Sequence, residues 1–198
     1  MIDVWAGRAR RILPARFVMS AGTLAVGWFL LAPKDYEELG RSAHYQVTFT
    51  SNLLCSRQHG YFDASSDIKP LLHTWSLAVE EQFYICFPLL LTLLSSRLKH
   101  WRLALFAVLL VSFGMSVWAV QHEPQKAFFL LHLRAWELLA GAMLAVQPKR
   151  EWRASPALAQ GVSLASLGLI LIAVLGYAAN TPFPGATAFL PGLGVVGL

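Results

Sequence analysis

The sequence predicts an all-α fold: a polytopic bundle of transmembrane helices. Of the 198 residues, 56% are hydrophobic and 14% are charged, whereas about 25% of the residues in an average soluble domain are charged. The mean hydropathy is +0.52. The apolar residues come in runs of roughly twenty, the length of helix that crosses a hydrocarbon core of roughly 30 Å. A soluble domain of this size could not bury so much apolar surface.

The apolar runs define five complete spans, over residues 12–32, 76–96, 103–120, 127–147 and 157–177. A sixth span begins near Ala186 and is truncated at Leu198. Residues 40–56, GRSAHYQVTFTSNLLCS, are too polar to cross a bilayer by hydropathy. We expect this segment to form a helix that lies at the membrane interface or is buried in the bundle.

Short clusters of basic residues separate the apolar runs and predict the orientation of the chain. If residues 40–56 do not cross, ten of the sixteen basic residues lie on one side, which is predicted to be cytoplasmic: Arg8, Arg10, Arg11, Arg16, Arg97, Lys99, Arg102, Lys149, Arg150 and Arg153. The opposite loops hold most of the loop acids: Asp35, Glu37, Glu38, Asp63, Asp67 and Glu123. This pattern argues for a lipid bilayer as partner and against nucleic acid.

Metal and nucleotide motifs are absent from the sequence. Cys55 and Cys86 lie in different segments without metal-ligand spacing, and we interpret both as apolar positions. No Walker loop, GxGxxG, HExxH or zinc spacing occurs. No metal site is therefore predicted.

Two adjacent carboxylates, Glu80 and Glu81, lie near the start of a predicted span, in the stretch HTWSLAVEEQFYICFPLLL over residues 73–91. Charges inside hydrocarbon are costly and mark functional or paired sites. On a helix, Glu80 shares a stripe with His73, Ser76, Tyr84 and Phe87, roughly 10 Å below the outer end, whereas Glu81 points about 100° away. The stripe suits a proton path or a hydroxyl-binding groove. Alternatively, the carboxylates pair with arginines and fix helix packing.

A second charged pair, Arg134 and Glu137, lies at i,i+3 spacing in FFLLHLRAWELLAGAMLA. It is either a structural ion pair, or Arg134 contacts a carboxylate of the 76–96 helix or an anionic group of the substrate.

Three arginines, Arg8, Arg10 and Arg11, stand at a helix entrance in GRARRILPARF. Such a cluster can bind phosphates through charge and through the free N–H groups of the first turn. The alternative is that these arginines only set the orientation of the first span.

The longest of these motifs, HTWSLAVEEQFY, resembles the central motif of the acyltransferase-3 family, bacterial inner-membrane O-acyltransferases of cell-envelope polysaccharides. RARRILPA resembles the cytoplasmic arginine motif of this family, and SNLLCSRQHGYFDASSDIKPLLHTWS resembles its outer loop. RAWELLAGAMLA and TPFPGATAFLPGLG are similar to later segments, particularly in members with a fused SGNH domain. The resemblance covers nearly the whole chain.

The resemblance implies transfer of an acyl group, usually acetyl from cytoplasmic acetyl-CoA, to a sugar hydroxyl outside the membrane, as in lipopolysaccharide biosynthesis. It implies that Arg8 and Arg11, with Arg10 beside them, bind the phosphates of acyl-CoA. It maps the acidic residue of the WSL motif onto Glu80, at the transfer site or its support. His73, the histidine next to the acidic stripe, and Arg134 are further catalytic candidates, although the role of general base is not assigned to His73.

One feature of the family is missing. Its first helix carries a basic residue followed eleven positions later by a histidine thought to be catalytic, and no basic residue here has a histidine at that offset. We therefore expect residues 1–198 to be a partial acyltransferase-3 membrane domain that lacks the first two helices, the last helices and any SGNH domain. The alternatives to an active O-acyltransferase core are an inactive truncated member, a scaffold, or a transporter or flippase of an envelope precursor.

Overall fold

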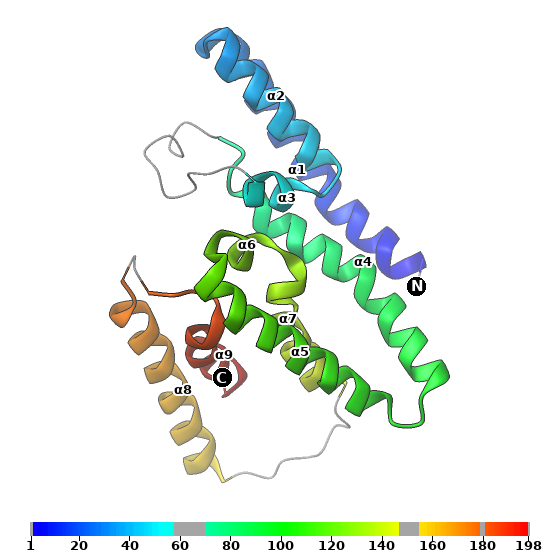
Figure 1. Cartoon of the computed structure of the whole chain (residues 1–198), viewed down its shortest axis with the longest axis vertical. Helices are drawn as coiled ribbons and strands as arrows, with labels where there is room; N and C mark the ends of the chain where they lie inside the picture. The colour runs from blue at the N-terminus through cyan, green and yellow to red at the C-terminus, as the bar shows by residue number, and fades with distance from the viewer. Residues whose placement is uncertain (1, 58–69, 147–154, 179–180, 198) are drawn as a thin grey trace. The chain divides into compact units, whose positions relative to one another are not determined.

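The computed structural model describes residues 2–57, 70–146, 155–178 and 181–197, which form helices and no strand (Figure 1). In these residues, five helices are long and apolar enough to cross a membrane: Trp5–Leu30, Thr74–Arg97, Trp101–His122, Pro124–Ala145 and Pro156–Gly176. The chain is thus an all-α, multi-pass membrane protein, and the five predicted spans are confirmed. The loop residues Asp63, Asp67, Lys149, Arg150 and Arg153 lie outside the described part.

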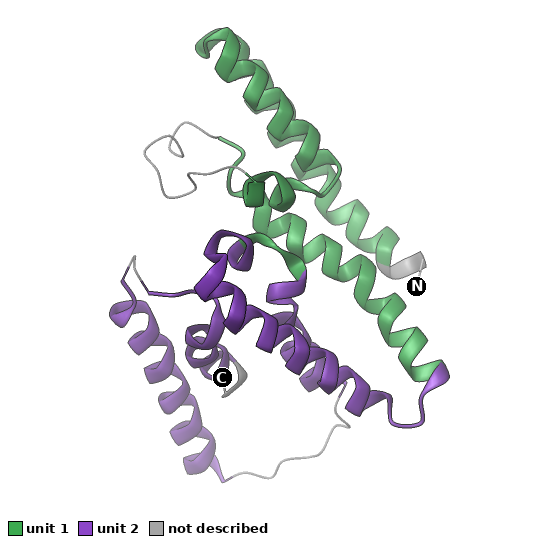
Figure 2. Cartoon of the chain, viewed as in Figure 1, with its two compact units in different colours: residues 1–96, 129–131 green, residues 97–128, 132–198 purple. Residues whose placement is uncertain are grey.

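The chain divides into two compact units (Figure 2). Unit 1 comprises residues 1–96 and 129–131, and unit 2 comprises residues 97–128 and 132–198. Unit 1 contains α1 (Ile2–Leu30), α2 (Pro33–Val47), α3 (Ser51–Arg57) and α4 (Thr74–Arg97). Unit 2 contains α5 (Trp101–His122), most of α6 (Pro124–Phe129) and of α7 (Leu131–Ala145), α8 (Pro156–Gly176), a short 3₁₀ turn (Gly185–Ala188) and α9 (Phe189–Gly197).

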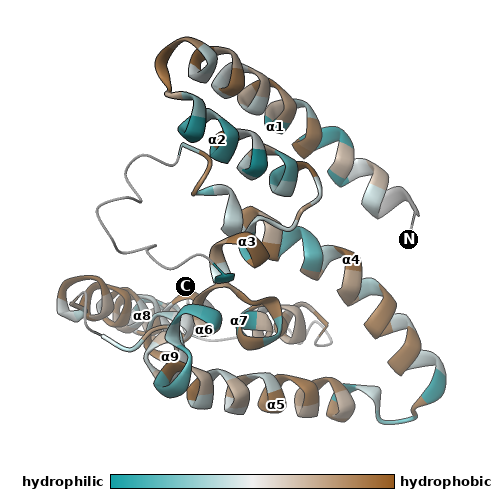
Figure 3. Ribbon diagram, turned by 45° about the horizontal axis from the view of Figure 1, so that its top comes forward, coloured by the Kyte–Doolittle hydropathy of each residue, from teal (hydrophilic) through white to brown (hydrophobic). Residues whose placement is uncertain are grey.

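A helical hairpin of α1 and α2 opens unit 1. Pro33 begins α2, because its missing N–H and fixed φ suit the first helical position. A Cβ at Gly27 would lie 2.6 Å from the side chain of Leu39, so the two helices approach closely there. Leu39 and Ala43 form a small buried core with Leu71. α2 carries hydrophilic residues, whereas α4 and α5 are largely hydrophobic (Figure 3).

The polar segment 40–56 forms the end of α2, a turn, and most of α3. Neither helix is among the candidate spans of the described residues. Gln46 and Asn52 in this segment are fully buried. Of the two predicted alternatives, burial inside the bundle therefore describes the segment better than an interfacial position.

The fourth span is interrupted at Leu130, between α6 and α7. The side-chain amide of Asn52 donates to the backbone carbonyl of Phe129, at 3.2 Å, just before the interruption. Hydropathy predicted a continuous helix over residues 127–147, because an apolar run carries no signal for such a break.

The last helices of unit 2 pack tightly. A Cβ at Gly194 in α9 would lie 2.8 Å from the backbone carbonyl of Ser166 in α8, so only glycine fits without a shift. The sixth predicted span corresponds to a short apolar helix, Gly185–Val195.

Candidate active site

An arginine of α1 meets a carboxylate of α4 inside unit 1. Arg8 Nη1 lies 4.0 Å from Glu81 Oε1. The Arg8 guanidinium also lies over the ring of Tyr84, with its Cζ 3.0 Å from the ring centroid. The side chain of Glu81 is 11% exposed and that of Arg8 is 34% exposed. The structure therefore joins two motifs that lie far apart in the sequence.

A cavity of about 190 Å³ lies at this contact. Its lining combines three aromatic rings, one cation, one carboxylate and aliphatic side chains: Trp5, Arg8, Ala9, Ile12, Leu13, Phe49, Glu81, Tyr84 and Ile85. The indole N–H of Trp5 donates to the backbone carbonyl of Tyr84 at 3.2 Å and ties α1 to α4. The cavity thus presents a charged pair in mostly apolar surroundings, where its electrostatic interactions are stronger than in water.

A second arginine of α1, Arg16, packs on Phe49, which lines the same cavity. It is 6% exposed and donates through Nη2 to the backbone carbonyl of Gln46. Its guanidinium lies 4.3 Å from the ring centroid of Phe49, and it interacts electrostatically with Glu81. Ser20 Oγ lies 3.1 Å from Gln46 Oε1, to which it donates. Sequence reasoning counted Arg16 only as a determinant of orientation, although its place inside the predicted span 12–32 signalled a need for partners.

The turn that carries Phe49 is fixed by a buried amide network. Gln82 of α4 donates through Nε2 to the Phe49 carbonyl at 2.8 Å and to Asn52 Oδ1 at 2.9 Å. Phe49 itself has a positive φ of 55°, which is unusual for a bulky residue. These amides hold one wall of the cavity, and nothing in the residue pattern predicts that they pair.

Of the predicted outer stripe, Tyr84 lines the cavity, whereas the two site candidates Glu80 and His73 do not. Glu80, His73 and Ser76 are exposed, whereas Glu81 is 8% exposed and lines the cavity. One step along a helix turns a side chain by about 100°, which separates the neighbouring carboxylates. The structure brings Glu81 rather than Glu80 to Arg8. The catalytic roles of Glu80 and His73 stay predictions.

The three arginines of the arginine motif also differ in their burial. Arg8 is partly buried at the cavity, whereas Arg10 and Arg11 are exposed. Glu81 follows Thr74, the first residue of α4, by seven residues and precedes its last residue, Arg97, by sixteen. At about 1.5 Å per residue, the pair is some 10 Å from one end of α4 and some 24 Å from the other. Arg8 is predicted to lie on the cytoplasmic side, yet it contacts a part of α4 nearer to the predicted outer end, so a cytoplasmic ligand has to extend into the bundle to reach it.

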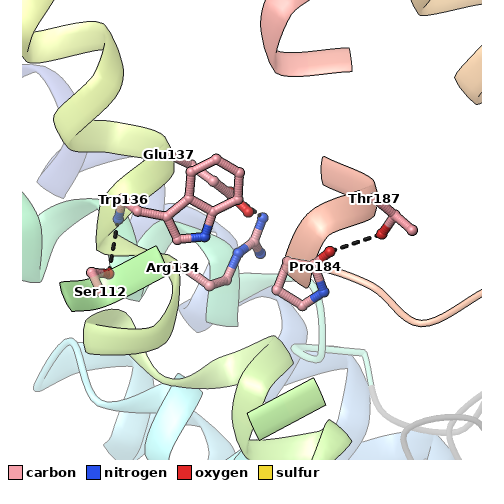
Figure 4. A network of polar contacts seen from close by, with 6 residues as sticks. All are labelled: Ser112, Arg134, Trp136, Glu137, Pro184 and Thr187. Atoms are coloured by element: carbon pink, nitrogen blue, oxygen red, sulfur yellow. Dashed lines mark hydrogen bonds and ion pairs between the residues drawn. The ribbon is translucent and has the colours of Figure 1, made fainter. Parts of the chain in front are cut away.

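Unit 2 contains the predicted i,i+3 pair. Arg134 Nη2 lies 2.9 Å from Glu137 Oε2, and their side chains are 19% and 26% exposed, so the pairing is confirmed (Figure 4). Ser112 of α5 donates to the His132 carbonyl at 2.7 Å and accepts from the Trp136 N–H at 3.0 Å. These bonds tie α5 to α7. Whether Arg134 also has a catalytic role stays a prediction.

The described residues contain no group of three His, Cys, Asp or Glu side chains placed to hold a metal ion. Cys55 is buried and Cys86 is exposed.

The fold and the site define a multi-pass membrane protein with a partly buried arginine–carboxylate pair that lines a mostly apolar cavity. A family profile described as an acyltransferase domain matches residues 1–197, and the chain belongs to this family, acyltransferase-3.

Curated relatives come from several bacteria. The chain is 34% identical over 70% of its length to an uncharacterized protein of Haemophilus influenzae, 60% of which is covered. It is 30% identical over 93% of its length to a putative membrane-bound transacylase, BcsY, of Komagataeibacter xylinus, 47% of which is covered. It is 31% identical over 73% of its length to the O-acetyltransferase OatA of Staphylococcus aureus, 24% of which is covered. The chain thus spans less than two thirds of each of these relatives. No solved structure matches it.

Proposed function

We propose that this chain forms the membrane core of an O-acyltransferase. It takes an acyl group, most simply acetyl, from cytoplasmic acyl-CoA and transfers it to a hydroxyl of a cell-envelope polysaccharide or lipid-linked glycan, such as lipopolysaccharide O-antigen. Its place is the bacterial inner membrane. Membership of the acyltransferase-3 family supports this proposal, as do the names of two relatives, a transacylase and an O-acetyltransferase.

One observation links the proposed function to particular residues: Arg8, from the arginine motif, lies in a cavity beside Glu81. A guanidinium binds phosphate and other oxyanions through paired N–H groups. Arg8 contacts the anionic part of the donor, and Arg10 and Arg11, both exposed next to it, add positive charge at the same helix end.

The reaction requires the hydroxyl oxygen to attack the thioester carbonyl carbon. The carbon–sulfur bond then breaks, and the hydroxyl proton ends on the released CoA thiol. Cationic side chains stabilise the oxyanion that forms on the carbonyl oxygen. Glu80, His73 and Arg134 remain the candidates for contact with the acceptor or the reacting groups.

Transfer of labelled acetate tests the function. Everted membrane vesicles containing the protein and envelope polysaccharide are incubated with acetyl-CoA that carries a radioactive acetyl group. We expect label in the polysaccharide that mild alkali releases as acetate, and we expect Arg8→Ala and Glu80→Ala to reduce it. Glu38→Gln is the matched control, because Glu38 is an exposed carboxylate of the same unit. Transport of a glycan precursor without any acyl transfer would contradict the proposal and favour a flippase.

A further inference from the structure

Glu81 pairs with Arg8 and also interacts electrostatically with Arg16, and the two arginines differ in their contacts and burial. We propose that Glu81 is a positioning residue of the donor site, which holds the Arg8 guanidinium in the cavity, over the ring of Tyr84, ready for the anionic part of the acyl donor. This inference rests on the proposed contact between Arg8 and the donor.

The first step concerns the carboxylate. Glu81 is 8% exposed, and its Oε1 atom is buried without a hydrogen-bond partner among the described residues. A buried carboxylate needs compensation by opposite charge, because its own desolvation is costly. The two guanidinium groups supply this charge. Glu81 therefore acts on its neighbours by charge rather than through a directed hydrogen bond.

The second step concerns the difference between the two arginines. Arg16 is 6% exposed, donates to the Gln46 carbonyl and packs on the Phe49 ring, so its position is fixed by its own contacts. Arg8 is more exposed, and its contacts are the 4.0 Å ion pair and the Tyr84 ring. Arg16 therefore stabilises the charge of Glu81, and Glu81 in turn retains the more exposed Arg8.

The third step concerns ligand binding. A long arginine side chain loses rotamer freedom when it binds an anion, and a side chain held in place beforehand loses less. Without the carboxylate, the Arg8 guanidinium has no countercharge in the cavity, and it turns toward water. Loss of this preorganisation corresponds to about a tenfold weaker binding of the anion.

A double-mutant cycle on coenzyme A binding tests the inference. The protein is purified in lipid nanodiscs, and the Kd for coenzyme A is measured by calorimetry for the wild type, Arg8→Gln, Glu81→Gln and the double variant. We expect each single variant to raise Kd about tenfold and the double variant to raise it no further than Arg8→Gln, because Glu81 acts through Arg8. Glu38→Gln, which removes an exposed carboxylate of α2, is expected to leave Kd unchanged.

A conservative variant separates positioning from a general loss of structure. Glu81→Asp keeps the charge, so its Kd is expected to lie between those of the wild type and Glu81→Gln. If Glu81→Gln does not fold, Glu81→Asp decides the matter: an intermediate Kd supports the inference, whereas an unchanged Kd, or a Kd as weak as that of Arg8→Gln, overturns it.

Two results would overturn this inference and leave the proposed function standing. One is an unchanged Kd in Glu81→Gln. The other is a Kd raised about a hundredfold in the double variant, which would mean that Glu81 acts on the ligand independently of Arg8. An unchanged Kd in Arg8→Gln would instead remove the donor role of Arg8, and with it the proposed assignment of the site.

Discussion

Unit 1 and unit 2 each contain an arginine–glutamate pair, and the two pairs are built differently. In unit 2, Arg134 and Glu137 belong to one helix and form a 2.9 Å contact. In unit 1, Arg8 and Glu81 belong to different helices, lie 4.0 Å apart and line a cavity. A local pair forms whenever its helix forms, so it needs little further support. A pair between helices depends on the packing around it, and this one lines a cavity.

The largest effect is expected on the stability of unit 1, when Arg16 is replaced. Arg16→Met removes a buried guanidinium and leaves the Gln46 carbonyl and Glu81 without it. Breaking a buried charged contact from one side costs about 3 kcal/mol. Unfolding of the purified protein in mixed detergent micelles measures the loss. A wild-type stability would show that Arg16 contributes no net energy to unit 1.

A smaller effect is expected on activity. Arg8→Ala removes the cation from the cavity, and we expect kcat/KM for the acyl donor to fall about thirtyfold, or about 2 kcal/mol. Arg134→Ala is expected to leave the donor KM unchanged, because its guanidinium already faces Glu137. Steady-state kinetics with varied acyl-CoA measures both. An equal rise of the donor KM in the two variants would show that Arg8 and Arg134 do not differ in their effect on donor binding.

Two close-packed glycines extend the comparison to helix packing. Gly194→Ala places a methyl group against the backbone of α8 and is expected to destabilise unit 2 by about 2 kcal/mol. Gly27→Ala meets only the flexible end of Leu39, and better helix propensity offsets part of the strain, so the expected cost is below about 1 kcal/mol. Detergent unfolding of the two variants in parallel tests this order, which the reverse result would refute.

The smallest effect is expected from a charge swap. In unit 2, Glu137→Arg alone places like charges side by side and is expected to cost about 0.5 to 1 kcal/mol, and adding Arg134→Glu should restore stability. Restored acyl transfer would assign Arg134 a structural role. The corresponding swap of Arg8 and Glu81 is expected to restore neither coenzyme A binding nor transfer, because the cation would then project from α4 instead of α1.

Local features of the sequence predicted much of this structure. The spans follow from hydropathy, and the contact between Arg134 and Glu137 follows from their spacing on one helix. The sequence offered pairing of the carboxylates with arginines as one alternative, but not the pair of Arg8 with Glu81, because that depends on how α1 packs on α4. Glu80 and Glu81 are adjacent residues of the same type, and only the rotation of α4 about its axis decides which of them faces the cavity. The pairing of Asn52 with Gln82 could not be predicted either. Residue type and local spacing do not indicate which distant residue a polar side chain will contact.

The interruption at Leu130 has a consequence for how the protein enters the bilayer. A carbonyl without a hydrogen-bond donor is costly in hydrocarbon, and the Phe129 carbonyl finds its donor in Asn52, more than seventy residues earlier in the chain. We expect the segment from α6 to α7 to complete its insertion only after α3 has been delivered to the bundle. Insertion would then follow the order of synthesis, because an early helix supplies a hydrogen-bond donor that a later segment needs.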